Sequence, residues 1–174
     1  MYEKIKSLAK QYYPETVAIR RDLHKYPEQG WLEMRTASLV AKKLEKLGYQ
    51  VLIGKEIMCE EYRMGVPDQE ILESNYQRAI SQGADPYYIK KVKDGFTAVA
   101  GILKNGSGPV VAIRFDMDAL CIEEDDSINH NPGKFGFISC NQGTMHACGH
   151  DGHVAIGLTV AKILSNIKDS IQGT

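Results

Sequence analysis

The sequence has no excess of charge of one sign and no long apolar run. Its 21 Lys and Arg residues are balanced by 22 Asp and Glu residues, for a formal net charge of −1. Because the basic residues are scattered, no patch for nucleic acid or an anionic membrane surface is expected. No segment approaches the ~18 consecutive apolar residues of a membrane-spanning helix, and the first residues lack the apolar core of a signal peptide. The sequence therefore predicts a cytoplasmic protein with no nucleic-acid or membrane partner.

Cysteine is also sparse. The four cysteines, Cys59, Cys121, Cys140 and Cys148, form no Cys-x-x-Cys pair and no dense disulfide spacing. In a reducing compartment they are predicted to be free thiols, the first three with structural roles. The length of 174 residues fits one domain, because a chain of this size can already bury a hydrophobic core.

The first half of the chain predicts helices and one short strand. The apolar spacing of residues 4–24 indicates a helix that is kinked at Pro14. Residues 36–47 have the clearest amphipathic pattern, with Gly48 where a glycine ends a helix. The β-like stretch "YQVLI" follows directly. Residues 58–95 are polar and broken by Pro and Gly, and are predicted to form an inserted helical hairpin.

The second half predicts two strands, a loop and a buried helix. The apolar, β-branched runs "FTAVAGIL" (96–103) and "GPVVAIRFDMDAL" (108–120) are joined by the turn-forming "KNGSG". They are therefore expected to be adjacent antiparallel strands. Residues 121–142 are predicted to be an irregular loop, and a strongly apolar helix is expected to begin at about Asp151.

Two carboxylates follow the second of these strands. Asp116 and Asp118 are two residues apart, so their side chains point to the same side of an extended chain. Strand carboxyl ends are where α/β proteins place their sites. Taken alone, the pair favours a solvated strand end, and the stretch that follows makes it a candidate site.

That stretch is "GTMHACGHDGH" (143–153), which concentrates histidine, cysteine and aspartate. One glycine separates Cys148 from His150, which allows both side chains to approach one point. Thiolate and imidazole are ligands for zinc, cobalt, nickel or manganese. Asp151 and His153 begin the next helix, where His153 can face the same cleft. The alternative is a histidine-rich loop with satisfied hydrogen bonds and an inert thiol.

These residues supply only part of a catalytic metal site. A catalytic zinc takes about three protein ligands and a water, whereas Cys148 and His150 are two. A general base beside the metal is also missing, since no glutamate follows residue 151. His24 is interpreted as a helix-end or supporting residue, and His130 as exposed.

Three segments, in this order, resemble the N-terminal part of the metal-dependent amidohydrolases, the family of hippurate hydrolase, aminoacylase and indoleacetyl-amino-acid hydrolases. They are "RRDLHKYPEQGWLEMRTASLVAKKLEKLGY", "VAIRFDMDAL" and "GTMHACGHDGHVAIGLTVAKIL". The resemblance spans nearly the whole chain. Within the family, the segments "RMGVPD", "GFTAVAGIL" and "GFISCNQG" most resemble hydrolases of p-aminobenzoyl-glutamate, a folate catabolite.

The resemblance implies a three-layer α/β/α catalytic domain of the zinc-exopeptidase type, with residues 1–174 as its N-terminal part and no inserted dimerisation domain. It implies Cys148 and His150 as ligands of two Mn or Zn ions, the cysteine bridging them. Asp118 would orient the site from behind a ligand. The implied reaction is hydrolysis of p-aminobenzoyl-glutamate or a related N-acyl amino acid by a metal-activated water. The implied partners are this small substrate and a second subunit or copy.

In the family, a strand with a Glu-Glu pair and further histidine ligands follow this region. In the 174 residues, no Glu-Glu pair and no histidine follows His153, which predicts a truncated or split catalytic domain that is inactive alone. The alternatives are a non-catalytic chain that binds a metal or a partner, and a redox thiol at Cys148.

Overall fold

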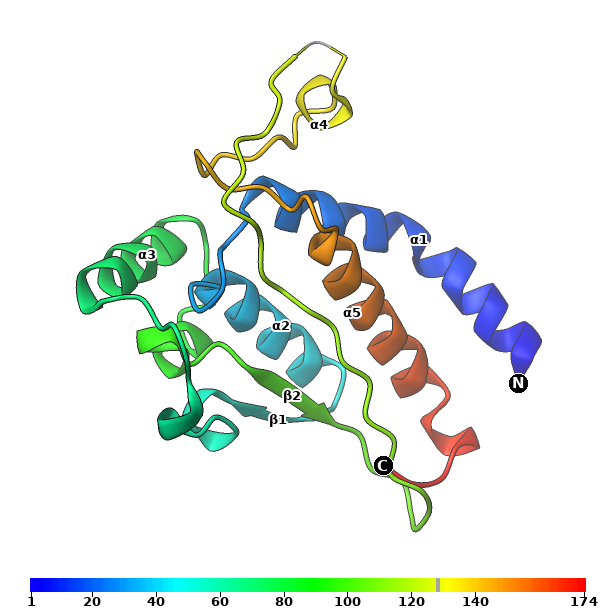
Figure 1. Cartoon of the computed structure of the whole chain (residues 1–174). Coiled ribbons are helices and arrows are strands. Elements are labelled where there is room, and N and C mark those ends of the chain that lie inside the picture. The colour runs from blue at the N-terminus through cyan, green and yellow to red at the C-terminus, as the bar shows by residue number, and fades with distance from the viewer. Residues whose placement is uncertain (128) are drawn as a thin grey trace.

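The computed structural model describes residues 1–127 and 129–174 (Figure 1). Helices dominate, and a small antiparallel sheet lies beside them. The helices and strands are α1 (Tyr2–Lys25), α2 (Met34–Lys46), β1 (Gln50–Ile53), α3 (Gln69–Ser81), β2 (Val99–Ile102), α4 (Asn131–Lys134) and α5 (His150–Asn166). Among the helices of the described residues, none has the length and apolar character that crossing a membrane requires.

α1 is one continuous helix that runs through Pro14, so Pro14 neither interrupts it nor starts a second helix. A proline inside a helix removes one backbone hydrogen bond, but Pro14 is exposed and α5 holds α1 close to it. Thr16 Oγ1 and Thr159 Oγ1 are 2.6 Å apart, and Lys162 pairs with Glu15. Packing between the two helices therefore outweighs the local cost of the proline.

α2 confirms the helix predicted for residues 36–47 and begins two residues earlier. Its Ala37, Ala41 and Leu44 are buried along one face, the face that the apolar spacing predicted. Gly48 ends the helix with a φ of 83°, a left-handed conformation that glycine adopts without strain. β1 then follows as the sequence predicted.

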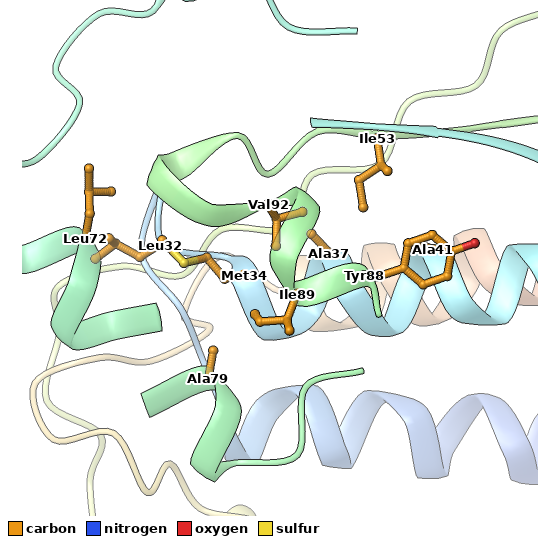
Figure 2. Packing of buried hydrophobic residues seen from close by; sticks show 10 residues of the cluster. All are labelled: Leu32, Met34, Ala37, Ala41, Ile53, Leu72, Ala79, Tyr88, Ile89 and Val92. Atoms are coloured by element: carbon orange, nitrogen blue, oxygen red, sulfur yellow. The ribbon is translucent and has the colours of Figure 1, made fainter. Parts of the chain in front are cut away.

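Residues 58–95 contain one α-helix, α3, so the predicted helical hairpin is wrong. Asp68 begins α3 by accepting the N–H of Ile71 at 3.0 Å. Between α3 and residue 95 the chain forms only short 3₁₀ turns, and Pro86 disfavours a helical conformation for the residue before it. The buried residues of this segment pack with α2 and β1 in the first hydrophobic cluster (Figure 2): Leu72, Ala79, Tyr88, Ile89 and Val92. The segment is therefore part of the core.

β1 and β2 pair antiparallel, with Ile53 opposite Val99 and Val51 opposite Gly101. The alternation of a strand places Val51 and Ile53 on the same face, and both pack in the first cluster together with Val99. One face of the sheet therefore covers α2.

Residues 109–117 do not form the predicted antiparallel partner of β2. They run extended beside it (Figure 1), but no strand is assigned to them. Their backbone hydrogen bonds within the described chain lie at their start, where the N–H of Val111 donates to the carbonyl of Thr174 at 2.9 Å. Val111 and Ile113 are 68% and 58% exposed. The apolar pattern is that of a strand, but a strand forms only where another pairs with it.

α5 confirms the buried helix predicted from about Asp151, and it begins at His150. Helices α1, α2 and α5 share the second hydrophobic cluster: Leu23, Leu44, Val154, Leu158 and Ala161. Residues 121–142 are irregular, as predicted, apart from α4, and residue 128 of this loop lies outside the described residues. α5 thus links the N-terminal helices to the loop that precedes it.

The contact between α5 and the extended segment gives a testable prediction at Gly157. A Cβ added there would lie 2.7 Å from Cδ2 of Phe115, which is closer than packing allows. We expect Gly157→Ala to lower the free energy of unfolding by about 1–3 kcal/mol. Gly152→Ala is the matched control in the same helix, because its Cβ would meet nothing within 4 Å. It should raise stability by up to about 1 kcal/mol. Urea unfolding measures both, and equal effects would contradict the packing.

Candidate metal centre

The candidate site lies where α5 begins. Leu120 and Met145 exchange two backbone hydrogen bonds of 3.0 Å each, which brings the chain after Asp118 beside the turn that starts α5. Gly149 precedes the helix with a φ of 79°, so this turn needs a glycine, as the spacing predicted. His150 is the first residue of α5 and faces Asp118.

His150 is oriented by Asp118. Its Nδ1 lies 3.0 Å from the Asp118 carbonyl oxygen and 3.0 Å from Oδ1 of the same residue. Because a carbonyl oxygen can only accept a hydrogen bond, Nδ1 carries the proton and the lone pair on Nε2 is free. A metal-binding histidine is commonly held in this way by an acceptor behind it. The structure thus brings together Asp118 and His150, two residues that the sequence analysis selected.

Two further side chains join His150. One ligand atom each of Asp116, His150 and His153 lies within 4.8 Å of the other two. The rings of His150 and His153 are stacked, with centroids 5.0 Å apart. Two imidazole nitrogens and a carboxylate oxygen form a donor set that suits zinc or manganese. Asp116 and His150 are half-buried and His153 is exposed, so one side of the group is open to solvent.

Cys148 is not in this group. Its thiol is free and exposed, so its role as a ligand stays a prediction. The sequence analysis treated Asp116 as a companion of Asp118 and did not select His153 as a ligand. The signals that identify them are the spacing of two residues along an extended chain and of three residues along a helix. The other three cysteines are also free and exposed, so the prediction of free thiols is confirmed, and their structural role stays a prediction.

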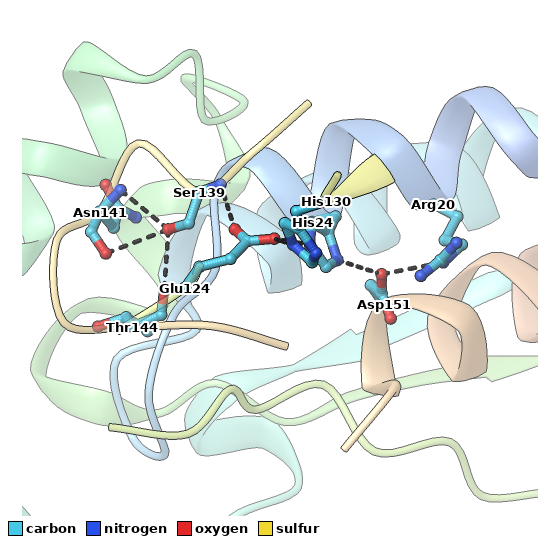
Figure 3. Close-up of polar contacts among 8 residues, drawn as sticks. All are labelled: Arg20, His24, Glu124, His130, Ser139, Asn141, Thr144 and Asp151. Atoms are coloured by element: carbon cyan, nitrogen blue, oxygen red, sulfur yellow. Dashed lines mark hydrogen bonds and ion pairs between the residues drawn. The ribbon is translucent and has the colours of Figure 1, made fainter. Parts of the chain in front are cut away.

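A buried polar network holds the turn at the start of α5 in place (Figure 3). His24 of α1 lies between two carboxylates, with Nδ1 2.8 Å from Oδ2 of Asp151 and Nε2 2.8 Å from Oε1 of Glu124. Arg20 Nε donates to the same Asp151 oxygen at 3.1 Å. His130 lies 2.7 Å from Glu124 Oε1 and is only 23% exposed, so the prediction that it is exposed is wrong.

The positive charge of His24 and the negative charges of Asp151 and Glu124 stabilise one another. Burial opposes the charge on His24, but its hydrogen bonds to Asp151 and Glu124 outweigh burial and raise its pKa. For both carboxyls, burial acts to raise the pKa, and contacts that include the His24 imidazole lower it. His24 is therefore more than the helix-end residue of the sequence analysis, because it joins α1 to the start of α5 and to the loop.

The loop is tied to the same network. Glu124 Oε2 accepts the backbone N–H of Ser139 at 2.6 Å, and Ser139 Oγ donates to the carbonyl of Thr144 at 2.8 Å (Figure 3). His146, two residues further along, is 4% exposed, and neither of its ring nitrogens has a partner among the described residues. Burial lowers its pKa to about 4, so His146 is uncharged at neutral pH.

Glu33 is another buried carboxyl near the site. Thr97 Oγ1 donates to its Oε2 at 2.8 Å. Burial raises the pKa of Glu33 to about 7, and the negative charges of Glu28 and Asp118 add to this effect. Glu33 is therefore partly protonated at neutral pH.

Comparison with known proteins shows which family the chain resembles. Residues 112–174 match the profile of peptidase family M20/M25/M40. The chain is 44% identical to a p-aminobenzoyl-glutamate hydrolase component, the A subunit from Escherichia coli, over 172 residues, which is 98% of this chain and 39% of that protein. It is 46% identical to indole-3-acetyl-aspartic acid hydrolase of Enterobacter agglomerans over 94% of this chain and 38% of that protein. The chain thus spans about two fifths of the length of these curated relatives.

Solved structures of two relatives also resemble this chain. An aminobenzoyl-glutamate utilization protein from Klebsiella pneumoniae superimposes with a TM-score of 0.79 at 34% identity, over 98% of this chain and 37% of that one. A Bacillus subtilis protein described as a dinuclear metal-binding peptidase of the M20 family superimposes with a TM-score of 0.60 at 28% identity, over 94% of this chain and 34% of that one. The α/β peptidase fold and the amidohydrolase resemblance expected from the sequence are confirmed.

The network predicts that His24 contributes strongly to stability. We expect His24→Leu to lower the free energy of unfolding by about 3–5 kcal/mol, because it leaves two buried carboxylates without their shared partner. His130→Leu is the control, since His130 contacts the same Glu124 oxygen from a more exposed position. It should cost less than about 1 kcal/mol. Urea unfolding at pH 7 compares the two, and similar losses would contradict a central role for His24.

Glu33 predicts a dependence of stability on pH. Its folded pKa of about 7 lies above the ordinary value of 4.5, so the folded state favours the protonated acid. The resulting stability is present below pH 4.5 and is lost as pH rises through 7, by about 3 kcal/mol. Glu33→Gln keeps an acceptor for Thr97 and should remove this part of the pH dependence. Urea unfolding between pH 4 and 8 measures it, and parallel curves for the two proteins would contradict the assignment.

Proposed function

We propose that this chain, which resembles M20/M25/M40 peptidases in sequence and fold, forms part of a metal-dependent amidohydrolase that cleaves an N-acyl amino acid. The observation that carries the proposal is the convergence of Asp116, His150 and His153, with Asp118 behind His150. Three convergent donors and an oriented imidazole favour a metal centre over a solvated strand end.

The proposed substrate class comes from the relatives. They are named as hydrolases of p-aminobenzoyl-glutamate and of indole-3-acetyl-aspartic acid. Both compounds join an aromatic acyl group to an acidic amino acid through an amide bond. We therefore propose p-aminobenzoyl-glutamate or a related N-acyl amino acid as the substrate.

The proposed chemistry divides between the metal and the chain. A bound Mn or Zn ion would polarise the amide carbonyl and activate water. His150 would bind through Nε2, with Asp116 and His153 as the other donors, and Asp118 would keep the Nδ1 proton of His150 in place. Cys148 is proposed as a ligand towards a second ion, in line with the dinuclear site named for the Bacillus subtilis relative.

The chain alone is proposed to be inactive. Amide hydrolysis of this kind needs a general base beside the metal-bound water, and the convergent group of described residues contains two histidines and an aspartate but no glutamate. We propose that further groups come from a second subunit or a second copy. The Escherichia coli relative is named as one subunit of its hydrolase, which supports a second polypeptide.

Metal binding tests the proposal without requiring activity. We expect Co²⁺ to bind and give a visible absorption spectrum, with affinity reduced at least about tenfold in His150→Ala and about 10–100-fold in Asp118→Asn. His130→Ala is the control, because His130 lies outside the convergent group. A change in the near-ultraviolet spectrum in Cys148→Ser would assign the thiol as a ligand. Equal affinities in all variants would contradict the site, and turnover of p-aminobenzoyl-glutamate by the isolated chain would contradict its proposed inactivity.

A further inference from the structure

Two guanidinium groups near the end of α3 carry donors without a partner. The Nε and Nη2 atoms of Arg78 are shielded from solvent and have no hydrogen-bond partner among the described residues, and the same is true of Nη1 of Arg35. Arg35 is only 5% exposed. A buried donor without an acceptor is costly, and more so when its group is charged. Such donors in a folded protein indicate a bound water or ion.

Gln82, directly after α3, brings the two arginines together. Its carbonyl oxygen accepts a hydrogen bond from Nε of Arg35 at 2.8 Å, and its backbone N–H donates to the Arg78 carbonyl at 2.9 Å. Its side-chain Nε2 donates to Oδ1 of Asn141 at 2.6 Å and lies 3.7 Å from Sγ of Cys140. Helices α2 and α3 and the loop at residues 140–141 therefore meet at this residue.

The electrostatics place both guanidinium groups close to Cys140. Burial raises the pKa of the Cys140 thiol, and the positive charges of Lys25, Arg35 and Arg78 act to lower it. Because the effect of a charge falls with distance, the three cations lie around the thiol. Cys140 is exposed, so the place where they meet is open to solvent at this residue.

This cluster has more positive than negative charge. Asp22 pairs with Nη2 of Arg35 at 2.9 and 3.0 Å, from an exposed position. Glu28 is buried, but its two oxygens accept the backbone N–H groups of Arg35 and Thr36, at 3.0 and 2.8 Å. Burial lowers the pKa of Arg78, and the negative charge of Glu28 offsets this only in part. The described part of the chain therefore does not balance the charge of Arg78.

We propose that Arg78 and Arg35 form a binding site for a small oxyanion, a carboxylate or a phosphate, at the end of α3. Nε and Nη2 lie on one edge of a guanidinium, where their spacing matches two oxygens of such an anion. Nη1 of Arg35 supplies a third donor. A water molecule would satisfy a donor but would leave the charge unbalanced. Neither arginine belongs to the candidate ligand group, so the site does not depend on the metal centre.

An anion in this site would join three parts of the chain. Asn141 Nδ2 donates to the Pro27 carbonyl at 2.8 Å, and the Thr144 N–H donates to the Asn141 carbonyl at 3.0 Å. From Thr144 the chain continues directly to the turn that starts α5. The anion would therefore hold α2, α3 and the loop that leads to the candidate metal centre, and it should stabilise the folded state.

Thermal unfolding at pH 7 and constant ionic strength tests the site, with sodium phosphate or sodium acetate compared with sodium chloride. At ten times the dissociation constant, the bound oxyanion should raise the melting temperature of the unmodified chain by about 3–5 °C. Phosphate also stabilises proteins through exclusion from their surface, so the specific effect is the part of the rise that Arg78→Met loses. Arg21→Met is the control, because Arg21 is exposed and stacks on Phe135, and it should respond as the unmodified chain does.

A second variant separates anion binding from folding. Arg78→Lys keeps the positive charge without the two-donor edge, and it should weaken the binding of the oxyanion at least about tenfold in the same titration. In chloride alone, Arg78→Met should melt no lower than the unmodified chain, because it removes an unpaired buried charge.

Three results would overturn the proposal. One is a rise with neither phosphate nor acetate, and another is an equal rise in Arg78→Met, which would show exclusion from the surface only. The third is a melting temperature of Arg78→Met several degrees lower in chloride, which would show that the chain itself pairs with Arg78. A specific rise with phosphate alone or with acetate alone supports the site and assigns its anion.

Discussion

The contact of His24 with two buried carboxylates is the constraint on which the site depends. It joins three parts of the chain that are far apart in the sequence: α1, the loop before α4 and the start of α5. Because an unpaired buried carboxylate is costly, each of these parts is stable only while the others are in place. Asp151 directly follows His150, so the network that holds Asp151 also fixes the first turn of α5.

The local features of the fold were predictable because their causes lie within a few residues. Gly48 and Gly149 adopt the positive φ values that their positions require, and α2 follows its apolar spacing. The errors arose where distant contacts decide. Pro14 stays inside α1 because α5 packs beside it, and residues 109–117 lack a strand because no described segment pairs along their length. A pattern of side chains shows that a segment suits a sheet, but not which neighbour it has.

In the candidate site, too, some residues could be selected from local sequence and others depend on distant contacts. Asp118 and His150 were predictable, one from its place after an apolar run and the other from the glycine turn before a helix. Asp116 and His153 were harder to select, because their convergence depends on how α5 is oriented against the extended segment. That orientation is set by the close approach of Gly157 to Phe115 and by the bridge between Leu120 and Met145, and neither contact has a signature in the sequence.

Residues 109–117 connect an apolar cavity to the candidate metal centre. They line a cavity of about 800 Å³ whose other walls are β2 and α5, and they supply Asp116 to the candidate ligand group at their end. Val111 and Ile113 are exposed, whereas Phe115 packs closely on Gly157 of α5. Because side chains alternate along an extended chain, Asp116 points away from the side on which Phe115 packs. The contact of Phe115 with α5 therefore helps to set where Asp116 lies relative to His150.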